Sequence, residues 1–244
     1  MRSLLLCIFL LPHWSVAQDL ASLAQFSQVT TLLLPLCGYT NTFKTKVDFR
    51  MFTVAGKPKG RLPFTWIMVN GIGRLEVLML ESDALPPEAR SALSSLGMET
   101  FAVIPRYDRN VTYVIQPNLR AYCEVPMTPN EVMEFRTMAA KRFARTDLGK
   151  ETINGQSCRK EKLVESGKTN EFALVWYPAI PTNGLPIRID LVTRQGTARA
   201  SLVHKQMKEA AASLVELPQG YVRLADGNAF IPYAMQLRNA ANAR

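Results

Sequence analysis

The chain has 244 residues, of which 48% are hydrophobic, and carries a formal net charge of +9 at pH 7. That hydrophobic content is enough for a sizeable core and excludes wholesale disorder. The excess of basic residues suits anionic head groups, acidic proteins or nucleic acid. However, the aromatic residues are not interleaved with the basic ones, as a nucleic-acid stacking platform would require, so we expect no nucleic-acid partner. A plainly solvated basic surface is the other interpretation.

The first 17 residues have the three parts of a secretory signal peptide. Arg2 supplies the positive charge, residues 4–11 form the apolar run, and Ser15-Val16-Ala17 is a small-residue cleavage site. A transmembrane anchor would need a longer apolar run, because the bilayer core is about 30 Å thick. We therefore expect cleavage after Ala17 and an exported, periplasmic protein.

Three cysteines remain after residue 17: Cys37, Cys123 and Cys158. In an oxidising compartment, one disulfide and one leftover thiol are expected. The sequence alone leaves the pairing open. We favour a disulfide between Cys123 and Cys158, because both lie in strand-like segments with a helix between them. No Cys-x-x-Cys motif points to a thiol oxidoreductase.

Alternating and turn-forming residues predict a series of antiparallel strands in the first half of the chain. Apolar residues alternate with charged ones over residues 43–51, which is typical of a strand with one wet face. The Asn70-Gly71 pair indicates a tight hairpin between the next two strands. A helix is expected to end before Pro35. The remaining elements expected here are strands at residues 64–69, 74–80, 100–104, 111–116 and 120–125, and a helix at 86–96.

The second half opens with a helix-start signal at Thr128-Pro129-Asn130-Glu131. The pattern predicts a helix that runs to about Ala144. Strands are expected after it, at residues 150–153, 158–165, 171–177, 186–193 and 197–207. No repeat or linker divides the chain. We therefore expect a single domain over residues 18–235 and a polar tail, residues 236–244, that is either frayed or helical.

Residues that could carry catalysis are sparse. His204 is the one histidine after residue 17, so a multi-histidine metal site cannot form. No nucleophile elbow, phosphate-binding loop or dinucleotide fingerprint is present. Cys37 or Cys158 with His204 could supply a nucleophile and a base, although a surface histidine on a strand is the commoner case. We expect a protein that is not an enzyme, with no catalytic residue, no cofactor and no metal.

The stretch from Gly149 to Tyr221 has an ordered series of turns and strand edges. It reads Gly149-x-Glu151-x-x-x-Gly155-x-x-Cys158-x-Lys160, Val175-Trp176-Tyr177-Pro178, Leu185-Pro186-Ile187-Arg188 and Leu217-Pro218-x-Gly220-Tyr221. This order resembles the C-terminal half of the outer-membrane lipoprotein carrier (LolA-like) superfamily, and within it poorly characterised periplasmic domains. The resemblance implies an α+β fold, mainly antiparallel β. Its sheet would be an incompletely closed half-barrel, with the helices at residues 86–96 and 129–144 covering a concave apolar face.

The same resemblance implies a cavity for acyl chains. Strand alternation and the apolar side of the second helix give its candidate lining residues, each of which core packing also explains: Phe49, Trp66, Met68, Leu78, Phe101, Tyr113, Tyr122, Val132, Phe135, Phe143 and Trp176. Basic residues near that helix are candidates for steering anionic head groups: Arg136, Lys141, Arg142 and Arg145. No single arginine clearly matches the lid-latching residue of the well-studied carriers, and Arg50 lies roughly where it would be sought.

Two functions follow from these patterns. The first is a periplasmic carrier or sensor, monomeric and able to touch the membrane peripherally, that binds lipid acyl chains or a lipidated protein. The alternative is a non-enzymatic interaction module with a filled core, whose partner is an envelope protein. Cavity volume distinguishes the two, because a ligand cavity differs from a core in being incompletely filled.

Overall fold

The computed structural model describes residues 42–83, 85–138, 143–166, 171–179, 185–205 and 211–243. These residues form one 12-stranded sheet in the order β12-β6-β5-β4-β3-β2-β1-β11-β10-β9-β8-β7. The strands are β1 (Thr42–Phe52), β2 (Pro58–Val69), β3 (Ile72–Leu78), β4 (Thr100–Arg106), β5 (Val111–Gln116), β6 (Ala121–Pro126), β7 (Phe143–Ile153), β8 (Gln156–Glu165), β9 (Phe172–Pro178), β10 (Arg188–Thr193), β11 (Gly196–Lys205) and β12 (Val222–Arg223).

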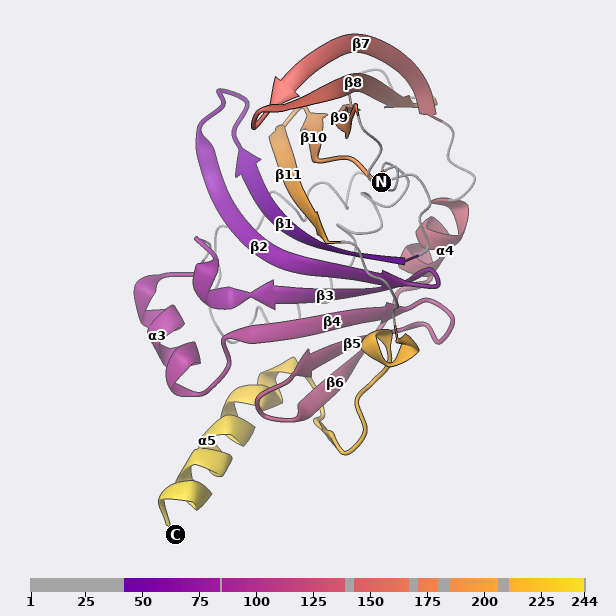
Figure 1. Cartoon of the computed structure of the whole chain (residues 1–244). Helices are drawn as coiled ribbons and strands as arrows, with labels where there is room; N and C mark the ends of the chain where they lie inside the picture. Colours follow the sequence, from indigo (N-terminus) through magenta and orange to yellow (C-terminus); the bar gives the residue numbers. More distant parts are fainter. Residues whose placement is uncertain are drawn as a thin grey trace.

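Neighbouring strands run antiparallel, except that β12 pairs with β6 in parallel. The sheet bends strongly, so that β7 and β8 arch over one end while β3 to β6 form the other (Figure 1). It does not close, since β7 and β12 stand at its two edges. The predicted fold class is confirmed: an open half-barrel, mainly antiparallel, with a few helices.

Alternation along each strand gives the sheet two chemically different faces. On β1, Phe43, Val47 and Phe49 are buried on one face, while Lys46 and Arg50 are exposed on the other. The first set joins a core that extends over β1 to β6 and β8 to β11. We call that side the apolar face. The opposite side of β1, β2 and β8 to β11 carries the ion pairs of Asp48 and Asp190, and we call it the charged face.

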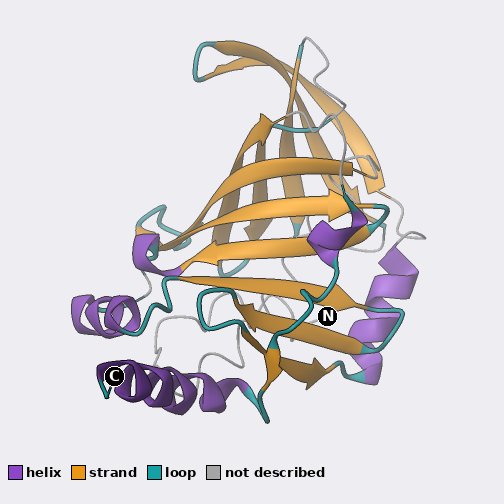
Figure 2. Cartoon of the chain, turned by 60° about the horizontal axis from the view of Figure 1, so that its bottom comes forward, coloured by secondary structure: helices purple, strands orange, loops and turns teal. Residues whose placement is uncertain are grey.

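Two helices pack on the apolar face. α3 (Pro87–Ser95) contributes Leu93 to the core, and α5 (Phe230–Asn242) contributes Phe230, whose ring meets the edge of Phe101 on β4 at a centroid distance of 5.6 Å. Both helices lie near the same ends of the strands (Figure 2). Residues 236–242 therefore continue a helix, which is one of the two predicted forms of the tail. None of the described helices is long and apolar enough to cross a membrane.

The second predicted helix begins as expected but ends earlier. α4 (Pro129–Met138) starts with a capping box, in which Thr128 accepts a hydrogen bond from the Glu131 amide at 3.3 Å and donates one from its own amide to the Glu131 carboxylate at 2.6 Å. The extension to Ala144 is wrong, because pairing with β8 draws residues 143 and 144 into β7. Residues 139–142 lie outside the described part.

α4 is not a lid on the described apolar core, to which none of its described side chains belongs. Phe135 instead stacks flat on Tyr107 in the β4–β5 turn, with ring centroids 3.6 Å apart. The helix lies at the opposite end of the strands from α3 and α5 (Figures 1 and 2). The resemblance predicted that the helix at residues 129–144 covers the apolar face. In the structure, α5 packs on that face and α4 does not.

The chain from residue 211 to residue 223 forms a strap across the other side of β2 to β6. Its 3-10 helix, η3 (Ala212–Val215), packs Val215 against Ile67 and Val69. Further along the strap, Leu217 and Tyr221 pack against the cluster around Ile104. The strap then pairs as β12 with β6, and η4 (Gly227–Ala229) leads into α5 on the apolar face. The C-terminal chain thereby covers both sides of one sheet edge.

The favoured disulfide is wrong. Cys123 lies on β6 and Cys158 on β8, near opposite ends of the sheet order, and both are free and buried. The helix between their strands leads to the far edge, at β7, and does not return the chain beside β6. Burial raises the pKa of the Cys123 thiol to about 11 and also raises that of Cys158. Cys37, the predicted signal peptide and the first predicted helix all lie outside the described residues.

Arg106 holds the strap against the sheet, and replacing it tests whether this contact stabilises the fold. Its guanidinium, with 6% of the side chain exposed, donates to Glu216 of the strap and to Asp108, both at 2.7 Å. Arg106→Ala leaves both carboxylates without this partner and is expected to lower the free energy of unfolding by about 1–3 kcal/mol in urea denaturation. Arg109 is half exposed and only 3.9–4.0 Å from the same carboxylates. Equal losses in Arg106→Ala and Arg109→Ala would contradict the assignment.

Candidate functional site

The structure divides the predicted cavity residues between different surfaces. Phe49, Trp66, Met68 and Phe101 lie together on the apolar face. Leu78, Tyr113, Tyr122 and Trp176 alternate with residues of that core and lie on the opposite face. Val132 and Phe135 belong to α4, whereas Phe143, at the start of β7, is half-buried against the core of the apolar face. The eleven residues therefore do not line one cavity.

Tyr113 and Tyr122 show the physical reason for this error. Their rings meet edge to face at 6.0 Å and pack against Ile104, in the cluster that the strap covers. Because both sides of β4 and β5 are covered, apolar residues occupy both phases of the alternation. The pattern of apolar residues along such a strand then does not identify which of its two sides faces the main core.

The apolar face also holds residues that the sequence analysis did not select. Across β9, β10 and β11 it presents Ala173, Ile189, Ala198 and Ala200. The two alanines of β11 have large partners on β1, since Phe49 lies opposite Ala200 and Met51 opposite Ala198. A signal was available, because residues 197–201 alternate polar side chains with alanine. This half of the face combines large side chains on one strand with small ones on the next.

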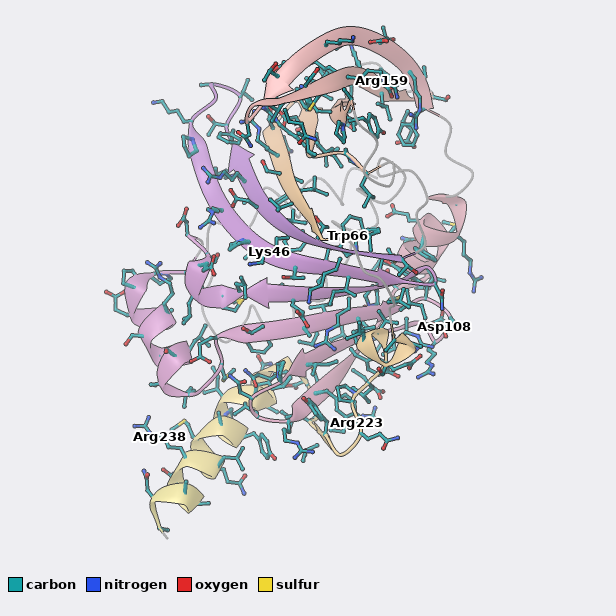
Figure 3. All side chains as sticks on the ribbon, viewed as in Figure 1. Lys46, Trp66, Asp108, Arg159, Arg223 and Arg238 are labelled. Carbon is teal, nitrogen blue, oxygen red and sulfur yellow. The ribbon has the colours of Figure 1, made fainter. Side chains whose placement is uncertain are left out.

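Among the described residues of the apolar face, Trp66 is the one with an unexplained polar group. The side chain is fully buried on β2 (Figure 3), and Phe43 meets its ring edge-on at 4.9 Å. The indole Nε1–H has no hydrogen-bond acceptor in the part of the chain that the structure describes. Gly73 lies across from Met68 on β3, and a Cβ there would stand 3.5 Å from this nitrogen. A buried donor without an acceptor is costly, and its presence in native proteins calls for a reason.

The charged face carries a pocket of about 690 Å³. It extends from Glu81 of η2 (Met79–Glu81) to Asn154 in the β7–β8 turn, and its floor is formed by β10, β11, β1 and β2. Its charged lining consists of Lys46, Asp48, Arg50, Arg61, Glu81, Arg188 and Arg199. Lys46 and Trp66, on the neighbouring strands β1 and β2, mark the two faces (Figure 3).

Asp190 is the buried anion of this face, with 4% of its surface exposed. Arg188 and Arg199 each donate two hydrogen bonds to its carboxylate, at distances from 2.6 to 3.0 Å. Burial alone would raise the pKa of Asp190, but these bonds and the two positive charges outweigh it and hold the pKa below its ordinary value. Asp190 is therefore ionised at neutral pH.

Asp48 makes a second, more exposed cluster of the same kind. It accepts hydrogen bonds from Arg50 at 2.8 Å and from Arg61 at 2.6 Å. The bond to Asp48 raises the pKa of Arg61. Asp48 and Asp190 are thus each shared by two arginines of the pocket lining.

Trp176 is held among charged groups and does not line an apolar cavity. Arg188 stacks over its ring at 4.4 Å and Lys160 at 4.9 Å. Its indole nitrogen donates to Glu151 at 3.0 Å. Hydrogen bonds from Lys160 and Trp176 lower the pKa of Glu151. Three residues of the sequence motif, Glu151, Lys160 and Trp176, therefore form one contact across β7, β8 and β9.

The four predicted steering residues do not form one group. Arg136 is exposed on α4, whereas Arg145 lies on β7 and donates to Glu161 at 3.1 Å. Arg159, on β8 in the arch formed by β7 and β8 (Figure 3), pairs with the same carboxylate at 2.8 Å. Lys141 and Arg142 lie outside the described residues.

The described residues offer little for catalysis or metal binding. No group of three or more histidine, cysteine or acidic side chains in that part of the chain could hold a metal ion. Cys158 lies on β8 and His204 on β11, with β9 and β10 between them. The raised pKa of the Cys158 thiol is the reverse of what a nucleophile needs.

The chain aligns with several solved structures. An uncharacterised conserved protein from Thermus thermophilus aligns with a TM-score of 0.43 and 10% identity over 86% of this chain and 99% of that one. MucB aligns with a TM-score of 0.40 and 10% identity over 81% of this chain, which spans 64% of the MucB chain. A LolA superfamily protein from Nitrosomonas europaea aligns with a TM-score of 0.32 and 9% identity over 83% and 98%.

These likenesses concern the fold alone. The LolA-like resemblance of the sequence predicts an open antiparallel half-barrel, and that is the fold observed. No protein-family model and no curated protein matches the chain.

The Asp190 cluster predicts how stability depends on pH. The pKa of Asp190 in the folded state lies below the value of about 3.9 expected when unfolded. Its contribution to stability is therefore complete above that value and is lost as pH falls through the folded-state pKa. Asp190→Asn should be less stable than the parent by about 1–3 kcal/mol at pH 7, with the difference shrinking in strong acid.

Urea denaturation at several pH values measures this difference. Asp83→Asn is the matched control, because Asp83 has an exposed side chain and its backbone amide donates to the carbonyl of Arg61, a residue of the same pocket. An Asp190→Asn deficit that stayed constant down to the lowest pH would contradict the assignment.

Proposed function

We propose that this protein is a non-enzymatic binding protein of the cell envelope, exported through its N-terminal segment, that holds an acyl chain against the apolar face of the half-barrel. The observation that carries the proposal is the buried Trp66 indole N–H, which lacks an acceptor among the described residues in the middle of that face. A fatty acid or lipid ester brings both an apolar chain and an oxygen that can accept this hydrogen bond. The unclosed sheet gives such a chain an edge by which to enter.

The energetics favour an apolar chain as the ligand. Transfer of each CH₂ group out of water contributes about 0.8 kcal/mol. A chain of about a dozen carbons then gives a gross driving force near 10 kcal/mol, from which ordering costs are subtracted. The hydrogen bond from Trp66 adds about 0.5–1.5 kcal/mol and fixes the polar end of the ligand near β2 and β3.

The small side chains of β9 and β11 are where we expect the chain to lie. Ala173, Ala198 and Ala200 fill less of the volume above the sheet than the leucines and phenylalanines of β2 and β4. This placement replaces the eleven-residue prediction with a smaller set on one face. Of the predicted lining residues, Phe49, Trp66, Met68, Phe101 and Phe143 stay in it.

A filled core is the alternative, and one observation favours it. Phe49 and Trp66 have 1% and 0% of their surfaces exposed, so other atoms of the chain already cover them. In that case the half-barrel would be a scaffold, and its partner would be an envelope protein. The two functions differ in whether the face opens to a lipid.

Tryptophan fluorescence tests the proposal, because the sheet places its two tryptophans on opposite faces. With Trp14 and Trp176 replaced by Phe, emission comes from Trp66 alone, and with Trp14 and Trp66 replaced it comes from Trp176 alone. Dibromostearic acid quenches tryptophan by contact. We expect saturable quenching of Trp66 and little quenching of Trp176. Two outcomes would favour the filled core, provided that an organic extract of the protein also contains no lipid. One is equal quenching of Trp66 and Trp176, and the other is no quenching of Trp66.

Filling the apolar face should weaken the binding of stearate. Ala200→Phe adds a ring on the apolar face and is expected to weaken the affinity for stearate at least about tenfold. Ser201→Phe adds the same ring at the next residue, on the charged face, and should leave the affinity unchanged. Thermal melts establish that each variant folds, and Ala173→Leu repeats the test with a smaller change. A loss that is equal in the Ala200 and Ser201 variants would contradict the proposed surface.

A further inference from the structure

The charged face contains a row of arginines whose positive charge is only partly neutralised by the ion pairs of that face. In the register of the sheet, Arg199 on β11 lies directly opposite Arg50 on β1, and Arg50 lies directly opposite Arg61 on β2. Like charges directly opposite one another in neighbouring strands are destabilising. Three in succession across adjacent strands therefore carry a repeated cost.

The neighbouring aspartates relieve only part of this repulsion. Asp190 is shared by Arg188 and Arg199, and Asp48 is shared by Arg50 and Arg61, so each cluster keeps one positive charge. Around the pocket, the five cations Lys46, Arg50, Arg61, Arg188 and Arg199 face the three carboxylates of Asp48, Glu81 and Asp190. The remaining formal charge is +2.

The clusters also hold the arginines in place. Arg188 is fixed by its two bonds to Asp190 and by stacking on Trp176 at 4.4 Å. Arg199 is fixed by the same aspartate and lies 5.0 Å from the centre of the Phe52 ring. Side chains held in this way lose little conformational entropy when they bind an anion, since they are already ordered.

The pocket floor between the two clusters is short and polar. Ser201 on β11 stands opposite Arg188 on one side and Asp48 on the other. Its side chain is small, so the arginines around it border a hollow with a hydroxyl group at its base. A serine hydroxyl can donate a hydrogen bond to an anion.

We propose that this pocket binds a phosphate monoester group. Such a group carries a charge between about −1.5 and −2 at neutral pH, which matches the +2 of the pocket, and has three acceptor oxygens. Guanidinium groups recognise phosphate with paired N–H donors, so arginine suits it better than lysine does. The volume of about 690 Å³ leaves room for a substituent on the phosphate.

The source of the phosphate is either soluble or the head group of a lipid, and the chemistry is shared. The site stands on the face opposite the acyl surface and does not depend on the proposed function. Ala200→Phe should leave phosphate binding intact, so the failure of either proposal can be told apart from the failure of the other.

Binding to the full chain is measured in two arms. In the first, inorganic phosphate is titrated by calorimetry, with sulfate at equal ionic strength as a second probe. In the second, the protein is sedimented with phosphatidylcholine vesicles that contain or lack phosphatidic acid. Binding of phosphate alone assigns a soluble source, and sedimentation that requires phosphatidic acid assigns a lipid head group.

Arg50→Gln is the decisive variant, because it removes one arginine of the row while Asp48 keeps Arg61. We expect affinity to fall at least about tenfold. Lys44→Gln is the matched control. It removes one charge from the same face of the same strand, outside the pocket lining, and should change affinity little. Ser201→Ala, which removes the hydroxyl and keeps every charge, should weaken binding without altering the thermal melt.

Two results would overturn the proposal. One is the absence of binding in both arms. The other is an equal loss in Lys44→Gln and Arg50→Gln, which would mean that the general positive charge of the chain attracts the anion and the pocket does not.

Discussion

The register of β1 between β11 and β2 is the constraint on which both surfaces depend. It places Phe49 against Ala200 and Leu62 on one face, and Arg50 against Arg199 and Arg61 on the other. Because side chains alternate with a period of two, a slip by one residue would move every apolar side chain of β1 into water and every charge into the core. The cost of that exchange fixes the pairing, and the pairing assembles both the apolar face and the arginine row.

An open sheet with this central pairing also needs two edges that do not join other sheets. At one edge, the strap pairs as β12 with β6, and Arg106 holds it through Glu216. At the other, β7 is mostly exposed and has a bulge between Asp147 and Lys150, where Gly149 has a φ of +86°. Bulges and charges on an edge strand discourage pairing with another chain. Gly149, the first residue of the sequence motif, therefore has a structural role in this bulge.

Local signals in the sequence predicted most strands and their turns. The Asn70-Gly71 hairpin is confirmed, with φ values of +51° and +80° that suit a tight turn. Long-range pairing was not predictable from such signals. The predicted end of α4 was wrong because residues 143 and 144 pair with β8. The predicted disulfide was wrong because the local residue pattern of each strand does not determine the order of the strands in the sheet.

The candidate site was predictable only in part, for a related reason. Alternation identified Phe49 on β1, where one face is wet, but failed for Tyr113 on β5, where both faces are covered. The arginine row escaped notice because Arg50, Arg61 and Arg199 are far apart in sequence and meet only through the register. A site built by strand pairing becomes visible when the sheet order is known.

We propose that the two faces of one sheet have different functions and that the apolar face receives an acyl chain. Nuclear Overhauser contacts between ¹³C-labelled alanine methyl groups and unlabelled stearate test it most directly. We expect contacts from the acyl chain to Ala173, Ala198 and Ala200, which share the apolar face. Saturating stearate that gave no contact to these methyl groups, or contacts only to residues of the charged face, would contradict it.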